Sequence, residues 1–223
     1  MNILIVSATI NEIKPFYTFL HPMVFSSENI TTLNNNTISV LVTGPGSAHT
    51  CFSVAQFLSK NKVDLAVNVG IAGSFDFNIT KGSVLHVIKD RFADLGVVQN
   101  DESFTDIFEM GLISKDKFPY QDGWIHTQAP QNINMDLPEV IGVTVNMVSG
   151  SQNSINRLKQ KYNPDIESME GAAFLFSCKM MHTPCLQIRS VSNYVEPRNK
   201  NNWNIPLAIE TLNDYLIRLL EKL

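Results

Sequence analysis

The amino-acid sequence predicts an α/β fold. Two continuous apolar runs, residues 2–7 and 64–69, have the composition of strands that are covered on both faces. Segments with apolar side chains at helical spacing alternate with such runs along the chain. At 223 residues the chain is long enough to bury a substantial core. We expect one domain over residues 1–223.

The first half of the chain alternates strand-like and helix-like segments. A helix pattern begins near residue 11, with Pro15 in its first turns, where a missing N–H costs little. A second helix is predicted after the Gly-Pro-Gly-Ser break at residues 44–47 and ends near residue 59. Residues 70–74, Gly-Ile-Ala-Gly-Ser, predict a turn after the central strand. Further strands are predicted over residues 37–43, 83–89 and 93–99.

Regular patterns fade over residues 100–138 and then resume. A long irregular segment in a compact domain is usually functional, and here a lid and an oligomer contact are equally good interpretations. Ser151 is a plausible cap for a helix that ends near residue 162, and Pro206 lies in the first turn of a closing helix. Strands are predicted over residues 140–149 and 185–192.

Composition excludes several classes of protein. The formal net charge of -4 gives no basic footprint for nucleic acid. No apolar run approaches the roughly 20 residues of a membrane-spanning helix, and the first residues are too short an apolar run for a signal peptide. Cys51, Cys178 and Cys185 form no CxxC pair, so we expect buried free thiols in a reducing compartment, most simply the cytoplasm.

The motif Ile-Glu-Ser-Met-Glu-Gly-Ala-Ala-Phe at residues 166–174 carries the strongest chemical signal. Glu170 lies at a predicted strand-to-helix junction, where the helix dipole favours an ionised carboxylate. An ionised carboxylate beside the apolar Met169 suits a ligand with hydroxyls and an apolar face, such as a ribose. The simpler alternative is that Glu170 only begins a helix.

Four polar or glycine-rich clusters follow predicted strands: Glu12, Gly70–Gly73, Met169–Glu170 and Ser192–Asn193. In open α/β sheets the carboxyl ends of the strands form the ligand-binding crevice, so we expect these clusters to meet there. The histidines follow no HxxH or HExxH pattern, and no metal site is expected. Two glycines at residues 44–47 could instead cradle an anion through backbone N–H groups.

In their order, these clusters resemble the nucleoside phosphorylase and nucleosidase superfamily, specifically its hydrolytic methylthioadenosine/S-adenosylhomocysteine nucleosidases. Those enzymes have a Glu after the first strand, a GxAG segment after a central strand and a V-E-M-E motif that binds ribose. The corresponding residues here are Glu12, Gly70–Gly73 and 167–170. The resemblance implies a three-layer α/β/α fold with a mixed central sheet, no cofactor, a purine nucleoside as substrate and a homodimer.

One departure from that pattern concerns the base. The nucleosidases have Ser-Asp where this chain has Ser192-Asn193, and the following V-E-P-R-N-K-N-N-W-N resembles futalosine hydrolases, whose base is hypoxanthine. Hypoxanthine presents acceptors at N7 and O6, and an Asn amide supplies donors to them. A carboxylate there would oppose acceptor to acceptor, which costs about 1–3 kcal/mol. Asn193 therefore favours a 6-oxopurine, unless it simply makes a turn.

The resemblance also implies roles for individual residues. Glu12 is the expected general base for the attacking water, Glu170 the acceptor for the 2′- and 3′-hydroxyls, and Asn193 the group that holds the departing purine. The remaining substrate contacts are expected from Gly73, Asn153, Ser154, Met169, Arg189 and Ser192. Arg189 could pair with Glu170 or Glu167, or orient Asn193. A cation for the benzoate-bearing tail could be Arg91, Arg198 or His49.

Three alternatives stay open from the sequence. The chain could cleave an adenine nucleoside (methylthioadenosine, S-adenosylhomocysteine or aminodeoxyfutalosine), it could be a purine nucleoside phosphorylase, or it could bind a nucleoside without catalysis. Glu12 stands where a hydrolase needs a base, which favours hydrolysis over phosphorolysis.

Overall fold

The computed structural model describes residues 1–20, 30–127, 130, 133 and 135–223. Within them, the main sheet has nine strands in the order β10-β9-β5-β11-β4-β1-β3-β2, with β8 paired to β5. The strands are β1 (Asn2–Ser7), β2 (Ile30–Leu33), β3 (Asn36–Val42), β4 (Leu65–Ser74), β5 (Val84–Asp90), β8 (Ile125–His126), β9 (Glu139–Thr144), β10 (Ile166–Ser168) and β11 (Cys185–Tyr194). A separate hairpin pairs β6 (Gly96–Val98) with β7 (Phe104–Asp106).

The sheet is mixed, as expected. β1 runs parallel to β3 and β4, and β4 runs parallel to β11, whereas β5 is antiparallel to β11. The short β10 pairs with β9 on one side and also with β4 on the other. Since β9 pairs with β5, this second pairing closes β4, β11, β5, β9 and β10 into a ring of paired strands.

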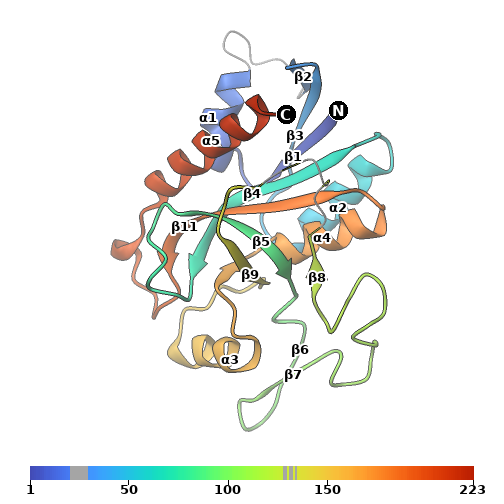
Figure 1. Ribbon diagram of the computed structural model, residues 1–223. Coiled ribbons are helices and arrows are strands. Elements are labelled where there is room, and N and C mark those ends of the chain that lie inside the picture. The colour runs from blue at the N-terminus through green and yellow to red at the C-terminus, as the bar shows by residue number, and fades with distance from the viewer. Residues whose placement is uncertain (21–29, 128–129, 131–132, 134) are drawn as a thin grey trace.

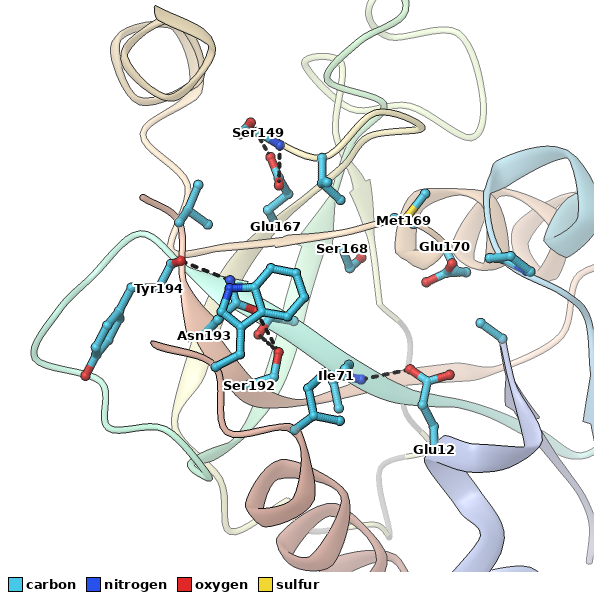
Figure 2. Close-up of a pocket in the computed structure, with 18 of the residues that line it drawn as sticks. Glu12, Ile71, Ser149, Glu167, Ser168, Met169, Glu170, Ser192, Asn193 and Tyr194 are labelled. Atoms are coloured by element: carbon cyan, nitrogen blue, oxygen red, sulfur yellow. Dashed lines mark hydrogen bonds between the residues drawn. The ribbon is translucent and has the colours of Figure 1, made fainter. Parts of the chain in front are cut away.

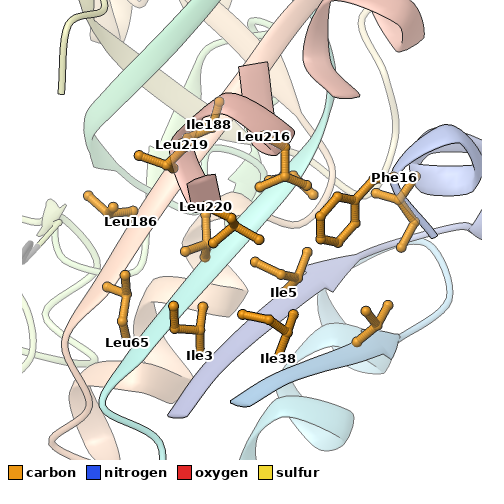
Figure 3. Packing of buried hydrophobic residues seen from close by; sticks show 14 of the residues in the cluster. Ile3, Ile5, Phe16, Ile38, Leu65, Leu186, Ile188, Leu216, Leu219 and Leu220 are labelled. Carbon is orange, nitrogen blue, oxygen red and sulfur yellow. The ribbon is translucent and has the colours of Figure 1, made fainter. Parts of the chain in front are cut away.

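Helices cover both faces of this sheet (Figure 1). The helices are α1 (Ile10–Leu20), α2 (Ser47–Leu58), α3 (Gln152–Tyr162), α4 (Gly171–Met180) and α5 (Ile205–Glu221), with a 3-10 turn at Lys200–Asn202. α1 and α5 lie side by side on one face, and α2 and α4 lie on the other (Figure 1). Leu216 and Leu220 of α5 pack on Ile5 of β1 and on β4 and β11 (Figure 3).

The structure corrects several predicted boundaries. Residues 70–74 are not a turn: β4 continues through them, because β11 and β10 supply pairing partners as far as Ser74. β11 likewise extends to Tyr194, so Asn193 lies within a strand. The strand predicted over residues 140–149 ends at Thr144, and that over 93–99 is reduced to the exposed β6. Ser151 does cap α3, and Pro206 does lie in the first turn of α5.

The segment over residues 100–138 is packed rather than uniformly irregular. It contains β7 and β8, and the side chains of Tyr120 and Ile125 are buried in the core beneath α4. Residues 128–129, 131–132 and 134 of this segment lie outside the described residues. Its role as a lid or an oligomer contact stays a prediction.

Candidate active site

A cavity of about 430 Å³ lies where β1, β4, β10 and β11 end. Figure 2 shows that Glu12, Ser192, Asn193, Met169 and Glu170 surround it. Ile71, Ala72 and Gly73 of β4 also line it. The four clusters that the sequence placed at strand ends therefore meet around one cavity.

Glu12 is held at the cavity by four donors. Its Oε2 accepts hydrogen bonds from the Thr9 N–H (3.0 Å), the Thr9 hydroxyl (2.9 Å) and the Ser7 hydroxyl (3.3 Å). Its Oε1 accepts from the Ile71 N–H at 3.2 Å. A Cβ at Gly70 would lie 3.0 Å from this Oε1, so the glycine gives the carboxylate its close approach to β4. The Glu12 side chain is thus fixed between β1 and β4.

The backbone of Glu12 is held by the buried Asn213 of α5. The Asn213 amide donates to the Glu12 carbonyl at 2.8 Å, and its Oδ1 accepts from the Phe16 N–H at 3.0 Å. In a regular helix these two backbone groups would bond to each other. Asn213 therefore ties the first turn of α1 to the closing helix, a contact that the sequence analysis missed.

Glu170 lies at the N-cap position of α4, but its side chain makes no capping bond there. Instead, its Oε1 accepts from the Gly46 N–H at 2.9 Å. Burial raises the pKa of Glu170, although Arg189 and the Gly46 N–H oppose this rise. Burial therefore opposes the ionised form that the helix dipole was expected to favour, and the side chain makes no bond to the first turn of α4.

Arg189 lies beneath the cavity and does not line it. Its side chain is fully buried, and a guanidinium Nη donates to Asn68 Oδ1. Burial lowers the pKa of Arg189, while Glu170 and Glu12 oppose this. In the described part of the chain it forms no ion pair within 4.0 Å of either carboxylate. The predicted substrate contact is therefore corrected: Arg189 lies below the cavity, where its charge favours the ionised form of Glu170.

Asn193 lies at the far end of the cavity from Glu170 (Figure 2). Its Oδ1 accepts from the Ser192 hydroxyl at 2.8 Å, and its Nδ2 donates to the Tyr194 carbonyl at 2.9 Å. These bonds fix which end of the amide is the donor. Because the amide nitrogen carries two N–H groups, one remains for a ligand. The Cβ missing at Gly73 would lie 3.1 Å from this nitrogen, so the glycine lets the Asn193 amide lie close against β4.

Two predicted contacts do not reach the cavity. Asn153 and Ser154 begin α3, where Ser154 completes the capping box with Ser151 and Asn153 donates to Glu102 at 3.2 Å. Neither residue lines the cavity. The prediction for them was wrong because β9 ends early and α3 stands away from the strand ends.

Of the three candidate cations for the substrate tail, one lines the cavity and two do not. Arg91 pairs with Asp106 at 2.7 Å and packs on Tyr162, away from the cavity. His49 bonds to the Pro45 carbonyl and does not line the cavity. Arg198 does line it, and its guanidinium lies 5.4 Å from the centre of the Trp203 ring.

The Gly44–Ser47 segment has little capacity left for an anion. Its Gly46 N–H bonds to Glu170, and its Ser47 N–H donates to Asn146 Oδ1 at 3.1 Å. Two of the backbone donors that could cradle a phosphate are therefore already used.

Glu167 and Ser149 also line the cavity. Sequence reasoning missed Ser149, and it placed Glu167 only in the ribose-binding motif and as a possible partner of Arg189. The Glu167 carboxylate accepts from the Ser149 N–H at 2.9 Å and from its hydroxyl at 2.6 Å. Glu167 stands three residues before Glu170 in the same motif, and that proximity was the available signal. Over the described residues, no group of three or more His, Cys, Asp or Glu side chains could hold a metal ion. No described helix is long and apolar enough to cross a membrane.

The mixed sheet between two helical layers, with a cavity at the strand ends, defines a three-layer α/β/α protein. The chain belongs to the phosphorylase superfamily, whose family model matches residues 7–221.

Among similar proteins, a futalosine hydrolase of Thermus thermophilus is 26% identical over 188 residues, which cover 81% of this chain and 80% of that protein. A 5′-methylthioadenosine/S-adenosylhomocysteine nucleosidase of Haemophilus ducreyi is 22% identical over 201 residues, covering 84% and 82%. A solved futalosine hydrolase of Helicobacter pylori aligns over 100% of this chain and 98% of its own, with a TM-score of 0.81 at 18% identity. That likeness shows the fold.

Proposed function

We propose that the protein hydrolyses the N-glycosidic bond of futalosine, which releases hypoxanthine and dehypoxanthine futalosine for menaquinone biosynthesis. The broader conclusion, an enzyme that hydrolyses nucleosides, rests on the family and on the hydrolases among its relatives. The choice of futalosine rests on one observation: an amide, Asn193, lines the cavity where a 6-oxopurine needs donors.

In the proposed mechanism the two carboxylates act on the sugar. Glu12 accepts a proton from the water that attacks C1′. Glu170 accepts hydrogen bonds from the ribose hydroxyls and stabilises the positive charge that develops on the sugar, which its burial strengthens. Met169 packs on the sugar face.

Asn193 acts on the base. Its remaining N–H donates to N7 or O6 of the purine as the bond to C1′ lengthens and negative charge moves onto the base. Ser192 keeps the amide oriented through the bond to Oδ1. An amide is no acid, so the proton that N7 gains comes from water.

Hydrolysis is favoured over phosphorolysis by the geometry around Gly46. Its N–H and that of Ser47 already bond side-chain acceptors, and a phosphate would also lie near the carboxylates of Glu12 and Glu170. Like charges so close are destabilising at low dielectric.

Two further parts of the proposal concern the substrate tail and the assembly. Arg198 is the candidate cation for the benzoate, because it lines the cavity whereas Arg91 and His49 do not. By resemblance, we also propose a cytoplasmic homodimer.

Purified protein should cleave futalosine in preference to methylthioadenosine and aminodeoxyfutalosine, because Asn193 matches the 6-oxo group. We would measure kcat/KM for the three nucleosides by release of free base, with and without phosphate. Preferred cleavage of an adenine nucleoside would reject futalosine as the substrate. A rate that rises with phosphate, together with release of a sugar 1-phosphate, would reject hydrolysis.

A further inference from the structure

Glu167 is a buried carboxylate that the proposed mechanism does not use. It is 6% exposed, lines the cavity, and lies on the opposite side of Gly73 from Asn193. Asn193 of β11 pairs with Gly73 on one side, and Glu167 of β10 pairs with Gly73 on the other. Residues in register across a sheet project to the same face, so the carboxylate and the amide face the cavity together.

Gly73 lets neighbouring side chains lie close against β4 between Glu167 and Asn193. The backbones of β10 and β11 are two strand spacings apart at this point, about 9–10 Å. A Cβ at position 73 would lie 2.9 Å from Val195 Cγ2 and 3.1 Å from Asn193 Nδ2. Glu167, Asn193 and Val195 all line the cavity, so a flat ring held there can present one edge to Asn193 and another to Glu167.

Glu167 is held as an acceptor. The Ser149 N–H donates to one of its oxygens and the Ser149 hydroxyl to the other. A carboxylate has about four acceptor positions, so each oxygen retains capacity for one more donor. Among the described residues no Lys, Arg or His lies within ion-pair distance of it. Since Glu167 lines the cavity, these acceptor positions can take a donor from a ligand there.

We propose that Glu167 selects 6-oxopurines by accepting a hydrogen bond from the N1–H of the base. A 6-oxopurine carries this N1–H beside its O6 acceptor, so Glu167 and Asn193 together present an acceptor and a donor that match both groups. A 6-aminopurine has a lone pair at N1 and would oppose acceptor to acceptor. This inference rests on the proposed function, and it assigns base specificity to a second residue besides Asn193.

Glu167→Gln tests the assignment with little change in shape. We would compare kcat/KM for futalosine and aminodeoxyfutalosine, two nucleosides that differ only at the 6-position of the purine. Loss of a hydrogen bond to a charged group predicts about a 10- to 100-fold fall for futalosine. For aminodeoxyfutalosine we expect no fall or a gain, because a Gln amide can donate to N1. Glu139→Gln, the same change at an exposed position on β9, should alter neither value.

Product binding supplies a test that needs no catalysis. Hypoxanthine should bind the unmodified protein at least about 10-fold more tightly than 1-methylhypoxanthine, which lacks the N1–H. Glu167→Gln should reduce this difference to a few-fold, as measured by calorimetry. Even if the variant does not fold, equal binding of the two bases to the unmodified protein would contradict the role of Glu167.

The outcomes separate the two proposals. If the unmodified protein prefers futalosine but Glu167→Gln lowers kcat/KM equally for both nucleosides, the role of Glu167 is wrong and the proposed function stands. Equal binding of the two bases to the unmodified protein has the same meaning. If the unmodified protein prefers aminodeoxyfutalosine, both proposals are rejected.

Discussion

At the scale of single residues, Glu12 shows how a general base can be held in one orientation while one of its oxygens can still accept another hydrogen bond. Three donors from Ser7 and Thr9 occupy Oε2, while among the described residues Oε1 accepts only from the Ile71 N–H. The less occupied Oε1 is therefore the oxygen with room for a water. The same bonds restrict the carboxylate to one orientation at the cavity, which is the preorganisation that general-base catalysis requires.

Glu12→Gln should remove the base while it preserves the shape of the side chain. We expect kcat to fall by about 10²- to 10⁴-fold, with KM changed by no more than a few-fold. Hypoxanthine should still bind, as measured by calorimetry. The control is Glu210→Gln, an exposed position on α5, which should leave kcat unchanged. Undiminished turnover in Glu12→Gln would remove Glu12 from the mechanism.

The sequence could predict residues that lie near the end of a strand, and it failed for residues whose placement depends on neighbouring strands. Glu12, Glu170 and Asn193 were found because the strand-end rule needs only local patterns. Glu167 was given no substrate contact of its own, because its place at the cavity depends on the pairing of β10 with Gly73, which lies 94 residues earlier in the chain. Asn153 was misplaced because the end of β9 could not be located from the apolar pattern alone.

At the scale of elements, α1 and α5 form a unit that positions the general base. Pro15 removes one backbone donor from α1, and Asn213 of α5 bonds the Glu12 carbonyl and the Phe16 N–H. An Asn inside an amphipathic helix gives no sequence signal for such a contact, since its partners lie about 200 residues earlier. The GxAG segment is comparable: two glycines predicted a turn, whereas strand pairing kept them in β4.

Asn213→Leu should uncouple α1 from α5. The Glu12 carbonyl and the Phe16 N–H lose a buried partner, so we expect a loss of about 1–3 kcal/mol in the free energy of unfolding. The first turn of α1 then closes on itself and moves Glu12, which should lower kcat about 10-fold or more. Urea denaturation and steady-state kinetics measure the two effects.

A matched control is Leu212→Ala on the same helix. It removes a fully buried side chain and should cost about 2–5 kcal/mol without touching Glu12. Its kcat per folded molecule should therefore match that of the unmodified protein. An equal loss of kcat in both variants would mean that Asn213 stabilises the fold without positioning Glu12.

At the scale of the whole molecule, one buried carboxylate, that of Asp90, links three neighbouring strands of the sheet. Asp90 at the end of β5 accepts from Gln187 of β11 at 2.9 Å and from the Thr144 hydroxyl of β9 at 2.9 Å. A Cβ at Gly171 would lie 2.2 Å from Asp90 Oδ2, so only glycine allows α4 to begin there. The ring of strands and the helix that follows Glu170 are thus built around this group, which no local pattern could reveal.

Burial raises the pKa of Asp90 from 3.8 to about 6, despite the hydrogen bonds from Gln187 and Thr144 and the nearby Arg189. The folded state therefore binds the proton more tightly than the unfolded state between these two pH values. In that window the free energy of unfolding falls as pH rises, and above it the loss is complete. A shift of about 2 pKa units corresponds to about 3 kcal/mol.

Asp90→Asn removes this titration. The Asn amide can donate to Gln187 Oε1, which has no partner among the described residues, once the Gln187 side-chain amide turns over. We expect the variant to gain about 3 kcal/mol relative to the unmodified protein as pH rises from about 4 to about 7. Urea denaturation of both proteins across this range measures the difference, in which the titration of all other groups cancels. Parallel stability curves would mean that Asp90 titrates no differently in the folded and unfolded states, and the burial of its charge would then carry no cost.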